Sequence, residues 1–138
     1  MRRVFVDSAL YIALLNEDDD LHDKAVRLAD DLNRDSAIRL VTTDAVLLEI
    51  FAYASGRGAA RRAATVAFAQ RLRESSSVDI IEQGRDLLDR GIDLYAARPD
   101  KRYSLVECMS MAVCRYQRTT DVLTHDRDFQ QEGLTILL

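Results

Sequence analysis

The sequence is poor in residues that interrupt or cross-link a chain. Among its 138 residues it has no Trp, one Pro, two Cys and five Gly. With so few Pro and Gly residues there is no room for a linker, so we expect one domain over residues 1–138. No apolar run reaches the ~18 residues of a membrane span, and Asp7 interrupts the first apolar stretch too early for a signal peptide. We therefore expect a cytoplasmic protein without a membrane partner.

The scarcity of Cys and His excludes the sites that these residues build. Cys108 and Cys114 fall in one expected helix, where six residues separate them by ~9 Å on nearly opposite faces. A disulfide cannot close over that separation, so both are expected to be small buried apolar residues. The two His residues, His22 and His125, are isolated, and no Cys/His cluster has the spacing of a zinc site.

Basic residues are outnumbered and unevenly distributed. The net charge is −4, and all but two of the 19 basic residues are Arg. Residues 55–73 contain several Arg and no acid. Because Arg suits bidentate contacts to phosphate, we take Arg57, Arg61 and Arg62 as candidates for binding a nucleic-acid backbone. A GC-rich genome gives the same excess of Arg, and a solvated basic face is an equally good interpretation.

Short apolar runs alternate with segments of helical periodicity along the whole chain. The runs predict strands at 3–6, 39–43, 77–81, 121–124 and 134–138. The periodic segments predict helices at 8–16, 21–33, 44–55, 58–74, 82–97 and 104–117, with a helical turn at 126–131. This alternation is typical of an α/β fold with a central, mainly parallel five-stranded sheet flanked by helices on both faces. Ligands of such sheets bind at the carboxyl ends of the strands.

Acidic residues follow these strand ends, and three of them also fit ordinary helix caps. Asp7 follows the first strand and precedes a helix, so it fits an N-cap. Asp126 follows the fourth strand and fits the cap of the next turn. Glu107 lies three residues after Ser104, which is the spacing of a capping box.

Glu49 has no such alternative except a solvent-facing position. It is flanked by apolar residues on both sides, and no basic residue lies within one helical turn of it. A carboxylate on a packed face must be paired or bind a cation. Because carboxylates that converge in one cleft repel each other, the cluster favours a hard divalent ion, Mg²⁺ or Mn²⁺. Clustered carboxylates with such an ion are typical of enzymes that displace an oxygen at phosphorus.

Four segments of the sequence together resemble PIN-domain endoribonucleases, most closely the VapC-like toxins of toxin–antitoxin pairs. The segments are Val6-Asp7-Ser8, residues 42–49, residues 100–108, and residues 123–129 followed by Gly133. Their order and spacing agree with the family over nearly the whole chain. The resemblance implies a single PIN-like domain that hydrolyses RNA phosphodiesters and leaves a 5′-phosphate and a 3′-hydroxyl.

The resemblance also assigns roles to particular residues. It implies metal-binding and catalytic acids at Asp7, Glu49, Glu107 and Asp126, with Ser104 and Thr124 as polar neighbours and Asp128 as an extra candidate ligand. The family usually has Asp where this chain has Glu107, which puts the metal geometry in question. The implied cofactor is Mg²⁺ or Mn²⁺, and the implied partners are RNA, a cognate antitoxin and a second copy of the chain in a homodimer.

Two other functions were weighed against this one. A catalytically weak or inactive PIN-like module that only binds RNA or a partner is the alternative, and Glu107 is the one residue that favours it. A phospho-acceptor receiver domain has the same fold class, but it needs an Asp after the third strand and a late Lys. This chain has Glu82 after that strand and no Lys beyond Lys101, so the sequence disfavours a receiver domain.

Overall fold

The computed structural model describes residues 1–138 and contains one five-stranded sheet with seven helices. The strands are β1 (Arg2–Val6), β2 (Ile38–Thr43), β3 (Val78–Ile81), β4 (Asp121–Leu123) and β5 (Thr135–Ile136). The helices are α1 (Ser8–Leu15), α2 (His22–Arg34), α3 (Asp44–Ala54), α4 (Ala59–Glu74), α5 (Arg85–Ala97), α6 (Leu105–Tyr116) and α7 (Asp128–Gln131). None of these helices combines the length and the apolar character needed to cross a membrane.

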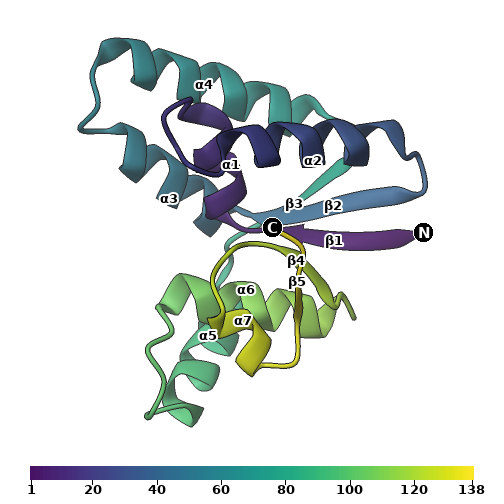
Figure 1. The fold of residues 1–138 in the computed structure, drawn as a ribbon. Coiled ribbons are helices and arrows are strands. Elements are labelled where there is room, and N and C mark those ends of the chain that lie inside the picture. The colour runs from purple at the N-terminus through teal and green to yellow at the C-terminus, as the bar shows by residue number, and fades with distance from the viewer.

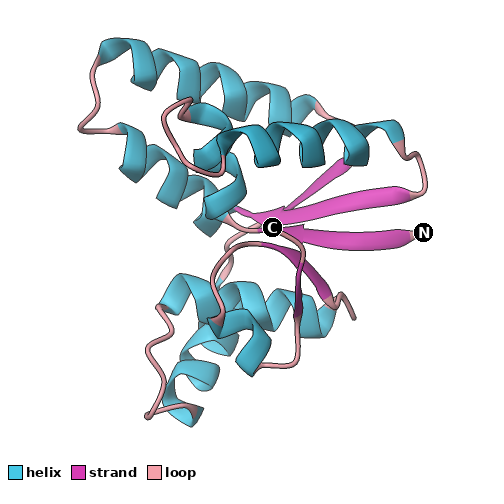
Figure 2. Ribbon diagram, in the orientation of Figure 1, coloured by secondary structure: helices cyan, strands magenta, loops and turns pink.

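The sheet has the order β3-β2-β1-β4-β5, and every neighbouring pair is parallel. Figure 1 shows α1 to α4 on one side of the sheet and α5 to α7 on the other, and Figure 2 shows the strands between these two helical layers. The predicted α/β fold, with a parallel sheet covered on both faces, is therefore confirmed.

The core lies where the apolar strands meet both helical layers. Val4, Phe5 and Val6 of β1 are completely buried, as are Val122 and Leu123 of β4. Strands covered on both faces read as continuous apolar runs rather than alternating ones, and this is why the sequence revealed them. The predicted state of Cys108 and Cys114 is also confirmed, since both are buried and free.

Most predicted boundaries lie within one residue of those in the structure, and three elements differ by two residues or more. The helix expected from residue 82 begins at Arg85, because residues 82–84 continue away from β3 without helical structure and Gly84 occupies the N-cap position. The turn expected from residue 126 begins at Asp128, because the Asp126 side chain bonds the amide of Asp128. The last strand is only Thr135–Ile136, which are the two residues that pair with β4.

Candidate active site

The strand order creates a switch point between β1 and β4. From β1 the chain builds outward through β2 to β3, and it returns to the other side of β1 for β4 and β5. Val6 pairs with Leu123 at the carboxyl end of these two strands. Asp7 therefore lies beside Thr124, at the place where ligands of open parallel sheets bind.

A pocket of about 500 Å³ lies at this switch point. Five carboxylates line it, namely those of Asp7, Asp19, Glu49, Glu107 and Asp126. The fold thus brings together the four acids that the sequence singled out, from segments as far apart as residues 7 and 126. Their roles as metal ligands stay predictions, because convergence in a pocket is a matter of position alone.

The Thr124 hydroxyl connects two of these acids. It is completely buried, donates a hydrogen bond of 3.0 Å to Oδ2 of Asp7 and accepts one of 3.1 Å from the backbone amide of Asp126. One hydroxyl thereby sets the position of Asp7 relative to the turn that holds Asp126. Asp7 occupies the N-cap position of α1, as the sequence indicated, but its side chain makes no capping hydrogen bond to that helix.

Glu107 takes part in a capping box, and one of its two oxygens remains free. Ser104 Oγ accepts from the Glu107 amide at 3.0 Å, and Glu107 Oε1 accepts from the Ser104 amide at 3.4 Å. The other oxygen, Oε2, is buried and has no hydrogen-bond partner. The sequence presented capping and metal binding as alternatives for this residue. In the structure the two oxygens of this carboxylate differ, because one caps the helix and the other is available to a cation.

The closest group of acids is Glu107, Asp126 and Asp128, whose carboxylate oxygens lie within 4.8 Å of one another. The pKa of Glu107 is raised to about 7. Burial is the largest cause, and the charge of Asp126 and a side-chain contact with Asp128 also raise it. Asp128 therefore lies close enough to share a cation with its two neighbours, which favours the extra ligand considered from the sequence. Its amide also bonds Asp126 Oδ1 at 2.9 Å, so the cap-like role expected of Asp126 is present as well.

Asp7 and Glu49 form the other part of the acidic pocket. Burial raises the pKa of Asp7, and the charge of Asp126 adds to this effect. Burial also raises the pKa of Glu49, with a further contribution from the charge of Asp7. Asp7 thus interacts electrostatically with acids on both sides of it. Glu49 is half-buried and lines the pocket, so the solvent-facing alternative for it is wrong.

Four polar residues of the pocket were not predicted as site residues, and the first of them is Ser8, which begins α1. Asp19 comes from the loop between α1 and α2, and His125 and Arg127 come from the loop that follows β4. Asp19 is one of four consecutive acids, and nothing in that run distinguishes it. Arg127 stands between two candidate ligands, Asp126 and Asp128, so its position in the sequence was an available signal.

The arginines proposed from the sequence for RNA binding lie outside this pocket, at the turn between α3 and α4. The Arg57 guanidinium lies 3.8 Å from the centre of the Tyr53 ring and bonds the Tyr53 carbonyl at 2.7 Å. Arg61 approaches the Tyr53 hydroxyl at 3.5 Å, and Arg62 bonds the Ser55 carbonyl at 3.2 Å. These side chains stabilise their own turn, and their contact with RNA stays a prediction.

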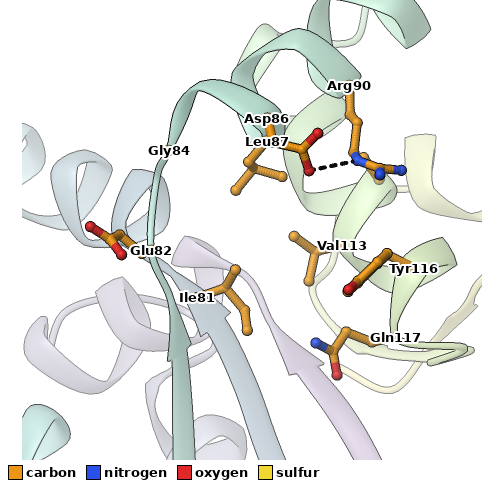
Figure 3. Close-up of a pocket in the computed structure, with 10 residues that line it drawn as sticks. Ile81, Glu82, Gly84, Asp86, Leu87, Arg90, Val113, Tyr116 and Gln117 are labelled. Atoms are coloured by element: carbon orange, nitrogen blue, oxygen red, sulfur yellow. Dashed lines mark hydrogen bonds and ion pairs between the residues drawn. The ribbon is translucent and has the colours of Figure 1, made fainter.

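A second pocket, of about 230 Å³, lies between the end of β3 and helices α5 and α6. Figure 3 shows that Asp86 and Arg90 face each other on its rim, joined by an ion pair of 2.9 Å. Arg90 also lies over the Tyr116 ring, 5.4 Å from its centre. Since Arg90 neutralises Asp86 and only Glu82 remains as an acid, this pocket lacks a carboxylate cluster. It shares no residue with the acidic pocket.

Comparison with known proteins gives a family and several similar structures. A model of the PIN domain family matches residues 4–132. The structure is similar to that of VapC20 from Mycobacterium tuberculosis, described as a sarcin-ricin loop cleaving toxin, with 26% sequence identity, 96% of each chain covered and a TM-score of 0.82.

Two more distant structures share the fold. They are VapBC2 from Rickettsia felis bound to a DNA fragment from its promoter (11% identity, 98% of this chain and 97% of that chain, TM-score 0.71) and FitAcB from Neisseria gonorrhoeae (14% identity, 98% and 96%, TM-score 0.66). No curated protein matches the sequence.

Replacement of Thr124 by Val tests the hydroxyl that joins Asp7 to Asp126. Val has the same shape, so the loss leaves a buried carboxylate oxygen and a backbone amide without their partner. We expect the free energy of unfolding to fall by about 1–3 kcal/mol, and Thr124→Ser to retain most of it. Chemical denaturation measures both.

The control for this experiment is Thr65→Val, another completely buried Thr, whose hydroxyl bonds only the Arg61 carbonyl of its own helix. We expect this variant to lose less than about 1 kcal/mol, since it gives up one neutral bond. If Thr124→Val were no less stable than Thr65→Val, the bridging role of Thr124 would be wrong.

The raised pKa of Glu107 predicts how stability depends on pH in metal-free buffer. Between about pH 4.5 and the folded pKa of about 7, the folded chain binds more protons at this site than the unfolded chain does. The free energy of unfolding from this group therefore falls as pH rises through that window. We expect wild type to lose thermal stability relative to Glu107→Gln between pH 5 and pH 8, measured by scanning calorimetry. Saturating Mg²⁺ should reduce the difference, and parallel pH profiles would contradict the expectation.

Proposed function

This chain belongs to the PIN domain family, and we propose that it is a metal-dependent endoribonuclease that acts as the toxin of a toxin–antitoxin pair. The observation that carries this proposal is the pocket at the switch point, where five carboxylates converge. Similarity to a sarcin-ricin loop cleaving toxin over 96% of both chains supports RNA as the substrate and the role as a toxin.

The residues present fit a hard divalent ion. Three carboxylates offer oxygens within 4.8 Å of one another, and Glu107 Oε2 is buried without a hydrogen-bond partner. A donor set made of carboxylate oxygens alone suits Mg²⁺ or Mn²⁺ and does not suit softer metals. We propose that Glu107, Asp126 and Asp128 hold the ion, with Asp7 and Glu49 supplying the remaining negative charge of the pocket.

Such an ion, when bound, makes an attacking water more acidic and offsets the charge that develops on the phosphate oxygens. The chain's own contribution is the placement of the acids. Thr124 holds Asp7 against the turn of Asp126, and the capping box holds Glu107 at the start of α6. The half-buried Glu107 carboxyl has a pKa of about 7, so a fraction of it is protonated at neutral pH and would release that proton when a cation binds. Metal binding is therefore expected to release protons.

A cognate antitoxin is the protein partner that this role requires, and similarity to VapBC2 supports it. We propose a cytoplasmic location, since the RNA substrate and the partner are made there. The first RNA to test is a hairpin with the sarcin-ricin loop sequence, because the relative with 26% identity is described as cutting that loop. The homodimer stays a prediction.

Replacement of Asp7 by Asn tests the proposed reaction. Asn keeps an oxygen that accepts from Thr124 but removes a charge from a repulsive cluster. We expect cleavage of the hairpin to fall by at least about 100-fold, with thermal stability in metal-free buffer equal or higher. In cells, expression of wild type alone should arrest growth, and neither Asp7→Asn nor wild type with its antitoxin should do so.

Controls for this experiment follow from the same chemistry. Wild type in EDTA should lose cleavage, and Mg²⁺ or Mn²⁺ should restore it. Cleavage that is undiminished by EDTA or by Asp7→Asn would contradict the metal-dependent reaction. Normal growth with confirmed soluble protein would contradict the toxin role while leaving the nuclease activity intact.

Replacement of Glu107 separates catalysis from the alternative of an inactive binding module. Gln fills the capping box as well as Glu does, so we expect Glu107→Gln to unfold within about 0.5 kcal/mol of wild type near pH 5. Its Mg²⁺ affinity and its cleavage should both fall steeply, since the free oxygen is replaced or left uncharged. Glu107→Asp restores the residue usual in the family and should keep or raise activity. Isothermal calorimetry with Mg²⁺ and a cleavage assay measure these effects.

The contrary outcomes are distinct. A Gln variant that binds Mg²⁺ and cuts like wild type would reduce Glu107 to a helix cap. A wild type that binds RNA without cutting it, combined with a Glu107→Asp variant that does cut, would identify this chain as an inactive PIN-like module.

A further inference from the structure

Arg127 is the only Arg or Lys among the residues that line the acidic pocket. It lies in the loop between β4 and α7, directly after Asp126 and directly before Asp128. The side chain is exposed to solvent. Neither the sequence resemblance nor the arrangement of the acids gives this residue a role.

The Arg127 guanidinium forms no ion pair and no hydrogen bond in the protein, although it has an acid on each side in the sequence. The five ion pairs of the chain involve Arg2, Arg39, Arg90, Arg98 and Lys101. The two acids beside Arg127 are engaged elsewhere. Asp126 bonds the Asp128 amide, and both carboxylates belong to the cluster with Glu107.

The backbone around Arg127 is fixed on both sides. The Asp126 amide bonds Thr124 Oγ1, the Arg127 carbonyl accepts from the Gln130 amide at 3.0 Å, and Phe129 is completely buried. The fixed backbone keeps Arg127 beside the pocket, and its guanidinium is free to bond a ligand there. The arginines of the turn between α3 and α4 differ from it, because Arg57 and Arg62 bond backbone carbonyls of that turn.

Electrostatics indicates what this guanidinium binds. Five carboxylates repel an RNA backbone, and one divalent ion offsets only two of their charges. A further positive charge is needed where the phosphate enters, and the planar fork of Arg matches two phosphate oxygens. We propose that Arg127 binds the phosphate group at which the RNA chain is cut, an inference that rests on the proposed nuclease function.

The test compares Arg127→Ala and Arg127→Lys with wild type in steady-state cleavage of the sarcin-ricin loop hairpin at several NaCl concentrations. We expect Arg127→Ala to lower kcat/KM by about 10- to 100-fold. The slope of log kcat/KM against log salt should become shallower by about one unit, because one phosphate contact is lost. Arg127→Lys keeps the charge without the fork and should recover part of the loss. Calorimetry should show Mg²⁺ binding at least as tightly in Arg127→Ala as in wild type.

The matched control is Arg34→Ala. Arg34 is exposed and forms no ion pair. It ends α2 just before β2 begins, so it lies at the amino-terminal end of the strands, opposite to the acids at their carboxyl ends. The control removes the same charge from the protein as a whole and should leave kcat/KM and the salt slope unchanged.

Three results would overturn the inference. The first is an Arg127→Ala variant with the kcat/KM and salt slope of wild type. The second is a loss of cleavage accompanied by weaker Mg²⁺ binding, which would make Arg127 part of the scaffold of the metal site. The third is a wild type that does not cut RNA under any metal condition, and this result alone would also refute the proposed function.

Discussion

Five carboxylates face one pocket at the carboxyl ends of β1 and β4, and their mutual repulsion has to be opposed by the rest of the structure. The buried carboxyl-terminal residues of β1 and β4 oppose it by fixing Asp7 beside Thr124 through the pairing of Val6 with Leu123. Burial and the charges of neighbouring acids raise the pKa of Asp7 and raise that of Glu107 to about 7. A cation bound among these carboxylates would relieve the same repulsion and would stabilise the folded chain.

The short loop after β4 serves several parts of the site at once. Thr124 begins it with the hydroxyl that holds Asp7, and the completely buried Phe129 anchors its far end. Between these two residues, Asp126 and Asp128 point their carboxylates at Glu107 while Arg127 remains unpaired. The carboxylates of Asp126 and Asp128 thus alternate with the guanidinium of Arg127 along one turn, and they form no ion pair with it. The proposed binding of both a cation and an anionic substrate would depend on this separation of charge.

The fold and the convergence of the acids could be predicted because both follow from local patterns. Continuous apolar runs indicated strands that are buried on both faces. Because parallel strands have their carboxyl ends on the same side of the sheet, the sequence also predicted that Asp7 and Asp126 lie close together. The inclusion of Asp19 could not be predicted in this way, because it depends on how the loop between α1 and α2 folds over the carboxyl end of the sheet. The late start of α5 was missed because Glu82 and Gln83 have ordinary helix propensity, whereas in the structure the Gln83 amide bonds Asp44 Oδ2 at 3.2 Å, outside the helix.

Glu107 shows why a single residue can satisfy two sequence interpretations. Its backbone is three residues into the α6 capping motif, so its carboxylate has to reach back to the Ser104 amide and also toward Asp126. The bond from the Ser104 amide to the Glu107 carboxylate is long, 3.4 Å. Asp, the residue usual in the family, is one methylene shorter, and its carboxylate is held closer to the helix. The extra methylene of Glu therefore extends the unbonded oxygen toward the other acids while the second oxygen stays with the helix, so that the start of α6 and the acidic cluster are coupled through one side chain.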